Sequence, residues 1–323
     1  MNKRLSTLVP ILFCAIAPAG AHAQAYPVKP VRIIVPYPPG GATDIFARLL
    51  GAKLAEPLGQ QVVIEQRPGA GGVIGAEAAA KSPPDGYTLW VGQASNLAIN
   101  QHLMGKLPYD PVRDFAPITL IAAAPNLLVV HPSLPVHRVK DLVALAKARP
   151  GAINYASAGN GSPGHLAAEY FKTLAGIDMV HIPYKGAAPA LTDVIAGHAS
   201  LYFTSPLSAK PHVQSGRLRQ IAVTSARRFP PLPEVPTMAE SGFADIDISS
   251  WWGLLAPAGV PRDIIARLHA DTVRVLNGVE LKDRLASQGA IVATDSPEQF
   301  AAHIRSEIAN WGRIVKASGA RLD

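Results

Sequence analysis

The chain has 323 residues, of which 48% are hydrophobic and only 16% are charged. This composition excludes an intrinsically disordered chain, because disordered segments are poor in apolar residues and rich in charge. The formal net charge of +7 does not indicate a nucleic-acid partner, since the basic residues are dispersed and are not interleaved with aromatic residues.

The N-terminus has the pattern of a secretory signal peptide. Lys3 and Arg4 form a positive start, and the mostly apolar run at 5–17 is too short to span a bilayer. Ala21-His22-Ala23 then provides the small residues that a signal-peptidase site requires. We therefore predict cleavage near Ala23, a mature protein that begins near Gln24, and export to the periplasm.

Cleavage would also remove the only cysteine, Cys14. The mature protein is therefore expected to contain no thiol, no disulfide and no cysteine-based metal site. Removing Lys3 and Arg4 lowers the formal charge by two, from +7 to +5. Such a mild positive excess either favours the approach of anions or only keeps the protein soluble.

Strand and helix patterns alternate from residue 31 onward, which is typical of α/β layers with parallel strands. Expected strands lie at 31–36, 62–64, 87–91, 127–130, 154–156, 180–182, 201–203 and 252–255. Expected helices lie at 43–54, in the alanine-rich stretch that ends near Lys81, and at 139–148, 165–174 and 188–196. A strand, a glycine-rich loop and a helix follow one another both at 31–54 and at 154–174, which suggests two similar domains.

The last helix has the clearest start signal. Ser296-Pro297-Glu298-Gln299 combines a capping serine, a proline at the first helical position and a glutamine three residues after the cap. The apolar residues that follow recur at helical spacing and predict one buried face, formed by Phe300, Ile304, Ile308, Trp311 and Val315.

The first glycine-rich loop, at 37–44, has the composition of an anion-binding site. Gly40 and Gly41 permit backbone conformations that bring N–H groups close to a ligand. The helix after them presents unpaired N–H groups and the positive end of its dipole. Thr43 adds a hydroxyl, whereas Asp44 is expected to interact with the helix start. The same residues also fit a tight strand-to-helix turn without a ligand.

The second glycine-rich loop, at 157–165, contains a Gly-x-Gly-x-x-Gly pattern at Gly159, Gly161 and Gly164. A dinucleotide site also needs an acidic residue at the end of the next strand, but that strand ends in Ile182-Pro183-Tyr184. We therefore exclude a nicotinamide or flavin cofactor. The loop predicts only a second helix N-terminus able to hold an anion.

Catalytic interpretations have less support. Gly161-Ser162-Pro163-Gly164 is similar to a nucleophile elbow, but Asn160 stands where that motif requires glycine. The sequence has no metal-binding motif, so we predict neither a metal nor another cofactor. His165, beside Ser162, is expected either at the surface near the helix start or in the lining of a cleft.

Several spaced motifs follow one another along nearly the whole mature chain: Val35-Pro36-Tyr37-Pro38-Pro39-Gly40-Gly41, Arg67-Pro68-Gly69-Ala70-Gly71-Gly72, Asp85-Gly86-Tyr87-Thr88-Leu89, Leu107-Pro108-Tyr109-Asp110-Pro111 and Pro183-Tyr184-Lys185-Gly186. In this order they resemble one family, the Bug/TctC periplasmic solute-binding proteins of tripartite tricarboxylate transporters. The resemblance implies an α/β fold of two domains, the type II periplasmic-binding-protein fold or Venus flytrap, with crossing hinge strands. The implied domains are 24–125 with 250–323, and 126–249, and the implied crossing strands lie near 127–130 and 252–255.

The resemblance also implies which residues hold the ligand. In such proteins, main-chain N–H groups and small hydroxyls grip a carboxylate while the two domains close over it. The implied ligand-binding residues of the first domain are Tyr37, Gly41, Ala42, Thr43 and Asp44, with Gln93 and Ser95 at the floor of the cleft. Those of the second domain are Gly159, Gly161, Ser162 and His165.

One departure from the family pattern bears on the ligand. Relatives often carry an acidic residue just after the strand at 201–203, where this chain has Thr204-Ser205. An amino-acid ligand would lose the counter-charge for its ammonium group at this place. The departure therefore weakens the expectation of an amino-acid ligand and leaves open carboxylates with a neutral body, including aromatic or aliphatic mono- and diacids.

The implied function is capture of a small organic acid for a transporter whose large and small membrane subunits are separate chains. The implied protein is a monomer and not an enzyme. Two alternatives remain, a hydrolase-like enzyme that uses the same cleft and a sensor that presents its ligand to a partner protein. The sequence has no nucleophile–base pattern to support the enzyme, and it does not separate transport from sensing.

Overall fold

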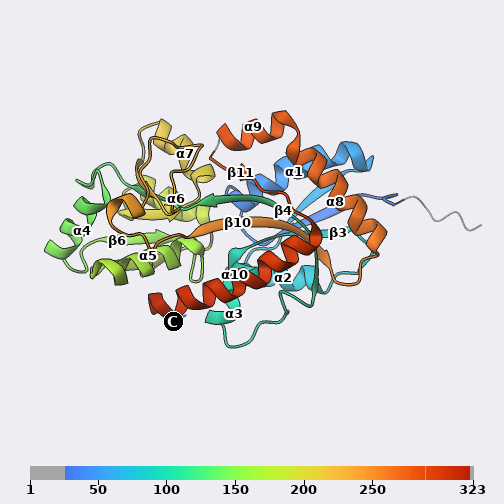
Figure 1. Cartoon of the computed structure of the whole chain (residues 1–323), viewed down its shortest axis with the longest axis horizontal. Coiled ribbons are helices and arrows are strands. Elements are labelled where there is room, and N and C mark those ends of the chain that lie inside the picture. The colour runs from blue at the N-terminus through green and yellow to red at the C-terminus, as the bar shows by residue number, and fades with distance from the viewer. Residues whose placement is uncertain (1–25, 288, 321–323) are drawn as a thin grey trace, which may run out of the picture.

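A computed structural model describes residues 26–287 and 289–320 of the chain (Figure 1). The signal-peptide prediction lies outside these residues. Within them, the expected alternation of strands and helices is present and the α/β class is confirmed. No helix in this part of the chain is both long enough and apolar enough to cross a membrane.

The first sheet has the strand order β11-β4-β10-β3-β1-β2. Its strands are β1 (Val31–Val35), β2 (Val62–Gln66), β3 (Thr88–Gln93), β4 (Phe115–Pro125), β10 (Ser249–Pro257) and β11 (Ile291–Val292). The β1 strand is parallel to both β2 and β3, whereas β10 runs antiparallel to its two neighbours, β3 and β4.

The second sheet has the strand order β7-β6-β8-β5-β9. Its strands are β5 (Leu127–Val130), β6 (Asn154–Ser157), β7 (Val180–Pro183), β8 (Leu201–Thr204) and β9 (Arg219–Val223). The β6 strand is parallel to β7 and β8, and β5 is antiparallel to β8 and β9. Both sheets therefore contain the expected parallel strands together with antiparallel strands that the sequence pattern did not indicate.

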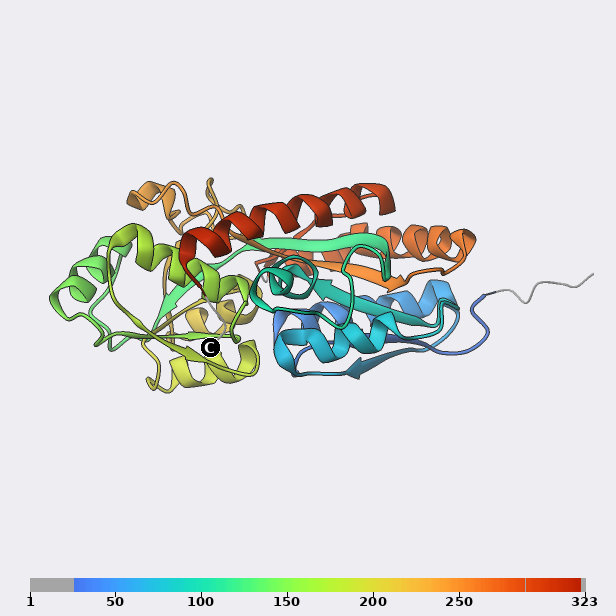
Figure 2. The same ribbon diagram turned by 90° about the horizontal axis from the view of Figure 1, so that it is seen from below.

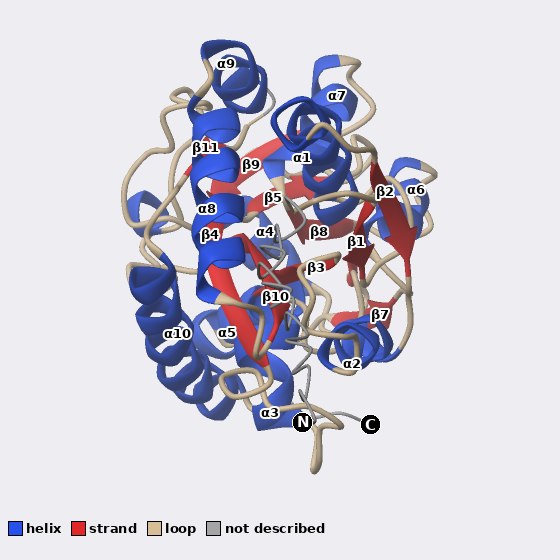
Figure 3. Cartoon of the chain, turned by 90° about the vertical axis from the view of Figure 1, so that its right-hand side faces the viewer, coloured by secondary structure: helices blue, strands red, loops and turns tan. Residues whose placement is uncertain are grey.

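Helices cover both faces of the sheets (Figure 3). They are α1 (Ala42–Leu58), α2 (Val73–Ala80), α3 (Asn100–Leu103), α4 (Val139–Ala148), α5 (Pro163–Ala175), α6 (Ala187–Ile195), α7 (Pro206–Gln214), α8 (Arg262–Asn277), α9 (Val279–Ser287) and α10 (Pro297–Ser318). Short helical turns occur at η1 (Ala70–Gly72), η2 (Ser95–Ile99) and η3 (Ala239–Ser241).

The central strands are buried on both faces. In β1, Ile33 packs with α1 residues on one side of the sheet, while its neighbour Ile34 packs in a separate apolar cluster with α2 and α10 residues. In β5, Leu127 and Leu128 divide between the same two clusters. Successive side chains of a strand point to opposite faces, so an unbroken apolar run supplies two cores at once.

The chain passes between the sheets twice. It leaves the first sheet where β4 ends at Pro125 and enters the second at Leu127, and it returns where β10 begins at Ser249. Ser249 is the register partner of Pro125, so the two passages lie side by side. This explains the mixed sheets, because the returning strand runs against its neighbours in the first sheet.

The longest strand, β4, is absent from the expected elements. Its sequence contains Pro117 and Pro125, and proline is a poor strand residue because it cannot donate to the ladder. The expected crossing strand at 127–130 belongs wholly to the second sheet, as β5. Strands β4 and β10 instead pair with each other in the first sheet up to the point of crossing. Strand β10 extends beyond the expected 252–255 at both ends.

Hydrogen bonds join the two passages. Asn126 and Thr224 exchange two hydrogen bonds, one from the Asn126 N–H to Thr224 Oγ1 at 2.8 Å and one from the Thr224 N–H to the Asn126 carbonyl at 2.9 Å. The Ile248 N–H donates to the Thr224 carbonyl at 3.1 Å, and the Ser250 hydroxyl donates to Asn126 Oδ1 at 3.1 Å. We call these four residues the crossing node.

The last helix begins as the sequence predicts. Ser296 Oγ accepts from the Gln299 N–H at 3.2 Å, while Gln299 Oε1 accepts from the Ser296 N–H at 2.9 Å. Helix α10 contacts η2 and β4 of the first half and α5 of the second, and Figure 2 shows it lying along both halves. The stripe residues Phe300, Ile304, Trp311 and Val315 are buried and Ile308 is partly buried.

Gly253 lets α10 pack closely against β10. A Cβ atom on Gly253 would lie 2.0 Å from Phe300 Cζ, well inside van der Waals contact. We expect Gly253→Ala to lower the free energy of unfolding by about 1–3 kcal/mol through overpacking. Gly105→Ala is the matched control, because nothing lies within 4 Å of the added methyl. Urea denaturation of both variants measures the difference, and equal stabilities would contradict this packing.

Candidate functional site

A small cavity of about 70 Å³, which we call the inner cavity, lies between the two halves of the molecule next to the crossing node. Its lining comes mainly from the two glycine-rich loops, the end of β3, the start of β10 and the turn from β8 into α7. The lining residues are Tyr37, Pro38, Gly41–Thr43, Gln93, Ala94, Asn126, Ala158, Ser162–Gly164, Ala187, Tyr202–Ser205, Ser208 and Ser250–Trp252. None of these lining residues is charged. A hollow of about 520 Å³ at the opposite end of α1, beside Lys53 and Arg274, is lined by neither loop.

The first loop is held by Asp44. One carboxylate oxygen accepts from the Gly40 N–H at 3.0 Å, and the other accepts from Arg48 at 2.8 Å and from Gln66 at 2.9 Å. Asp44 is buried and does not line the inner cavity. Its expected interaction with the helix start therefore takes the form of a bond to the loop that precedes it.

The two glycines of this loop have different conformations. Gly40 has φ of +87°, a region that favours glycine, whereas Gly41 is the N-cap of α1 with φ of −82° and ψ of 165°. The backbone conformation therefore favours glycine at Gly40, whereas the conformation of Gly41 is open to other residues. The first hydrogen bond within α1 is donated by Ile45 to Gly41, so the preceding N–H groups have no intrahelical acceptor.

Thr43, Gln93 and Trp252 form the floor of the inner cavity. The Thr43 hydroxyl donates to Gln93 Oε1 at 2.7 Å, and Trp252 Nε1 lies 2.9 Å from Gln93 Oε1 and 3.0 Å from Thr43 Oγ1. Gln93 Nε2 donates to Ser95 Oγ at 3.4 Å, and Ser95 itself is buried behind the floor. This network fixes the side chains that face the cavity from the first half.

The second loop leads into α5, whose N-cap is Ser162. Ser162 Oγ accepts from the His165 N–H at 3.3 Å, and Pro163 occupies the first helical position. Gly164 must lack a side chain, because a Cβ there would lie 1.9 Å from the Phe203 carbonyl oxygen. The N-terminus of α5 is thereby pressed against the end of β8, at the wall of the inner cavity.

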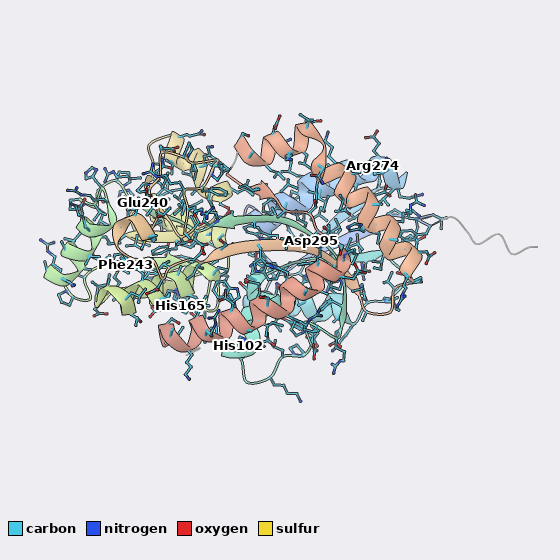
Figure 4. The ribbon with its side chains drawn as sticks, in the orientation of Figure 1. His102, His165, Glu240, Phe243, Arg274 and Asp295 are labelled. Atoms are coloured by element: carbon cyan, nitrogen blue, oxygen red, sulfur yellow. The ribbon has the colours of Figure 1, made fainter. Side chains whose placement is uncertain are left out.

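His165 lies in the first turn of α5 (Figure 4) and is not among the residues that line the cavity. Its Nδ1 accepts from the Gly161 N–H at 3.3 Å, and its ring stacks on His181 at 4.3 Å between centroids. Ser157 Oγ lies 2.6 Å from His181 Nε2 and accepts from the Gly159 N–H at 3.1 Å. Both rings thus support the backbone of the glycine loop.

Burial, aided by Lys172, lowers the pKa of His165 to about 4, although Glu169 opposes the shift.

Three buried polar atoms beside the inner cavity have no hydrogen-bond partner among the described residues. They are Asn126 Nδ2, Ser205 Oγ and Ser208 Oγ. Ser205 is the N-cap of α7 but makes no side-chain cap bond, and Ser208 lies in the first turn of that helix. Native proteins rarely leave such atoms unpaired, because an unsatisfied buried polar group costs about 1–3 kcal/mol.

Sequence reasoning missed this third helix N-terminus. A usable signal was present, since Ser205-Pro206 follows a buried strand just as Ser162-Pro163 follows β6. Asn126 had no local signal, because the crossing node alone brings it to the cavity.

The expected ligand-binding residues divide into three groups by position. Those that line the inner cavity are Tyr37, Gly41, Ala42, Thr43, Gln93 and Ser162. Gly159 lines a neighbouring chamber, which Tyr37 also borders. Asp44, Ser95, Gly161 and His165 line neither cavity. Of these four, Ser95 contacts the lining residue Gln93, and His165 contacts the lining residue Ser162.

Tyr37 is a neutral hydrogen-bond donor at the edge of the site. Burial raises its pKa to about 12, while hydrogen bonds with Ser95 and Gln93 act in the opposite direction. Its hydroxyl donates to the Gly71 carbonyl at 3.1 Å.

Among the residues that the structure describes, no three His, Cys, Asp or Glu side chains cluster as metal ligands would.

Two α/β halves joined by paired passages, with an uncharged cavity between them, are the architecture of the solute-binding proteins of transport systems. Residues 46–320 match the model of the tripartite tricarboxylate transporter family receptor, TctC, and the chain belongs to this family. The predicted family is thereby confirmed.

Relatives and solved structures agree with this assignment. Protein BugT of Bordetella pertussis is 38% identical over 98% of this chain and 99% of its own length. The structure of R. palustris Rpa4515 with adipate has a TM-score of 0.90 and 39% identity, over 92% of this chain and all of that one. MatC from Rhodopseudomonas palustris with bound malate has a TM-score of 0.85 and 32% identity, over 90% of this chain and all of that one. These similarities confirm the two-domain periplasmic-binding-protein fold and the receptor class.

His165 makes stability depend on pH. The unfolded chain takes up a proton at this imidazole near pH 6.5, whereas the folded protein takes it up only near pH 4. The folded-state pKa is depressed below the unfolded value, so the free energy of unfolding falls as pH drops from about 6.5 to 4, by up to ~3 kcal/mol.

Urea denaturation at several pH values between 7.5 and 4 measures this fall. We expect His165→Asn to be less stable at neutral pH but to lose less stability on acidification than the parent protein. His137→Asn is the control, because His137 is exposed and should leave the pH dependence unchanged. An undiminished fall in His165→Asn would show that other groups cause it.

Proposed function

We propose that this protein captures a small carboxylate in the inner cavity and delivers it to separate large and small membrane subunits of a tripartite tricarboxylate transporter. One observation carries the proposal. The N-termini of α1, α5 and α7 border a single uncharged cavity, together with the unpartnered polar atoms of Asn126, Ser205 and Ser208. The bound adipate and malate of Rpa4515 and MatC support the same ligand chemistry.

Helix N-termini suit an anion that has to be released again. Their free N–H groups and partial positive charge attract a carboxylate without a full cationic partner. Asn126 Nδ2, Ser205 Oγ and Ser208 Oγ are all able to donate hydrogen bonds, so a carboxylate would satisfy groups that the protein leaves open. The cavity wall after β8 is Thr204-Ser205, without a carboxylate to pair with an ammonium group, which favours a ligand that has none.

The predicted ligand-binding residues receive distinct roles in this proposal. The N–H groups at the start of α1, together with Tyr37 and Ser162, face the ligand, and Gln93 orients the floor. Asp44, Ser95, Gly159, Gly161 and His165 hold the two glycine loops and the floor in place.

We propose that domain 1 comprises 24–125 and 250–323 and that domain 2 comprises 126–249, with ligand-driven closure about the crossing node. The division of strands between two sheets supports these boundaries. The loops on the two sides already meet, since a Cβ on Gly41 would lie 3.6 Å from Ala187 Cβ and one on Gly186 would lie 3.0 Å from Pro38.

The remaining parts of the proposal concern location and partners. Cleavage near Ala23 releases a monomer into the periplasm, and the ligand leaves chemically unchanged. A sensor protein that reads the ligand-bound state would recognise the same closed form, so sensing is the second candidate function. Deletion of the neighbouring transporter genes separates the two, because uptake is lost only if the protein serves transport.

Removing the unpartnered hydroxyls tests the site. We expect Ser205→Ala and Ser208→Ala each to weaken carboxylate binding by about 1.5–3 kcal/mol, the usual worth of a hydrogen bond to a charged group. Neither variant should be less stable than the parent without ligand, because each hydroxyl has no partner to lose. Ser215→Ala, at the exposed C-terminal end of α7, is the control.

Calorimetry of residues 24–323 against a panel of mono- and dicarboxylates measures the affinities, and mass spectrometry of the recovered ligand checks that it is unchanged. Loss of apo stability in both serine variants with unaltered affinity would make these hydroxyls structural. Turnover of the ligand would overturn the receptor assignment in favour of an enzyme.

Closure about the crossing node predicts a change of shape. Each half holds part of the site, so a ligand that bridges them favours the closed form. Small-angle scattering should give a smaller radius of gyration with saturating ligand than without it. Identical curves in the presence of proven binding would exclude hinge closure.

A further inference from the structure

Two neighbouring tryptophans of β10 line the inner cavity, but their indole N–H groups have different partners. Trp252 Nε1 lies in the polar floor, 2.9 Å from Gln93 Oε1. Trp251 Nε1 instead donates to Glu307 Oε2 on α10, at 2.7 Å. The two rings pack in separate apolar clusters, because successive side chains of a strand point to opposite faces. The only polar atom of the Trp251 side chain is thus held by a residue that does not line the cavity.

Glu307 is a half-buried carboxylate that holds two indole rings with one oxygen atom. Its Oε2 accepts from Trp251 Nε1 at 2.7 Å and from Trp311 Nε1 at 2.8 Å. Among the residues that the structure describes, Glu307 forms no ion pair. Hydrogen bonds to a carboxylate are shorter and stronger than those between neutral groups. Glu307 is therefore a strong anchor for the Trp251 ring, and this is its route to the cavity wall.

Aromatic rings of α10 surround Trp251 but do not orient it by themselves. The Phe300 ring meets it at right angles, with 6.1 Å between centroids, and the His303 ring lies at 4.9 Å. Only 2% of Trp251 is exposed, so the ring has little room to move away. The last side-chain torsion of an aromatic residue has roughly two-fold preferences, so a flat ring can be turned over in one place. The bond to Glu307 selects one of these orientations.

The orientation of Trp251 matters because of where this residue lies in β10. On one side of it, Ser250 bonds to Asn126 of the crossing node, and on the other, Trp252 bonds to the cavity floor. Three consecutive lining residues are thus tied by polar bonds to the node, to α10 and to the floor. A ring left free to turn would have to be ordered when a ligand binds, and this costs affinity.

We propose that Glu307 is a positioning residue for ligand capture. From α10 it holds the Trp251 ring in one orientation at the wall of the inner cavity, with the N–H bound away from the ligand. Glu307 does not touch the ligand itself. This inference rests on the proposed function and adds to it a residue that lies outside the cavity and outside both glycine-rich loops.

Three substitutions at Glu307 test this role, with calorimetry of residues 24–323 against adipate and malate. Glu307→Leu removes the acceptor and should weaken binding about two- to tenfold, the cost of ordering one side chain on binding. Glu307→Gln keeps an oxygen that accepts from an indole and should retain most of the affinity. Glu307→Asp withdraws the carboxylate by one methylene and should give an intermediate loss. It replaces the leucine variant if that variant does not fold.

Two further variants separate positioning from stability. Val315→Ala opens space on the same buried face of α10, about two turns beyond Glu307. It should lower the melting temperature while affinity stays within about twofold, as expected for distant sites. Trp251→Phe removes the indole N–H, so adding Glu307→Leu to it should cause no further loss of affinity. A double variant that shows both single losses in full would mean that Glu307 does not act through Trp251.

The indole N–H signals in magnetic resonance spectra report the same contact without a ligand. The chain has four tryptophans, and comparison with Trp251→Phe identifies the signal of Trp251. Loss of the bond to the carboxylate in Glu307→Leu should move this proton signal upfield, and Glu307→Gln should move it less.

The outcomes separate this inference from the proposed function. Unchanged affinity in both Glu307→Leu and Glu307→Asp would overturn the positioning role while carboxylate capture stands. Failure of the parent protein to bind any carboxylate would overturn the proposed function. The Trp251 signal then decides the positioning role alone, since an unmoved signal in Glu307→Leu overturns it and a displaced one supports it.

Discussion

The crossing node is the constraint on which the rest of the structure depends. Every covalent link between the two halves passes through the backbone near Asn126 and Ile248, where Thr224 hydrogen-bonds to both passages. Buried backbone groups have to be paired, so the two passages cannot separate without losing these bonds. These bonds therefore fix the spacing of the two halves at the node.

The same node explains where the inner cavity lies. Ser250 holds the amide oxygen of Asn126, which leaves the amide nitrogen directed at the inner cavity. The inner cavity thus lies directly beside the node that joins the two halves. Helix N-termini complete it without charged side chains, and this avoids the large desolvation cost of burying an unpaired ion when the cavity is empty.

The two glycine loops are kept rigid by different means. In the first, the Asp44 carboxylate binds the backbone of the loop and is neutralised by Arg48. In the second, two stacked imidazole rings take this role, and His165 accepts from the Gly161 N–H. A rigid loop reduces the entropy lost on binding, so residues that never touch the ligand still contribute to its affinity. Reliance on a neutral His165 ties the second loop, but not the first, to the pH of the surroundings.

The sequence by itself determined the α/β class, the family, the capping of the last helix at Ser296 and the two glycine-rich loops, because these features depend on residues that are close together in the chain. It did not determine which polar groups line the inner cavity. Tertiary packing turned Asp44 and His165 into supports, and it brought Asn126 and Ser205 to the cavity from positions with weak or absent local patterns. Strand β4 was hidden for a related reason, since its two prolines oppose a strand locally and pairing with β10 overrides them. Local sequence patterns thus predicted the two glycine-rich loops. Only the packing of the two sheets decided which groups line the inner cavity together.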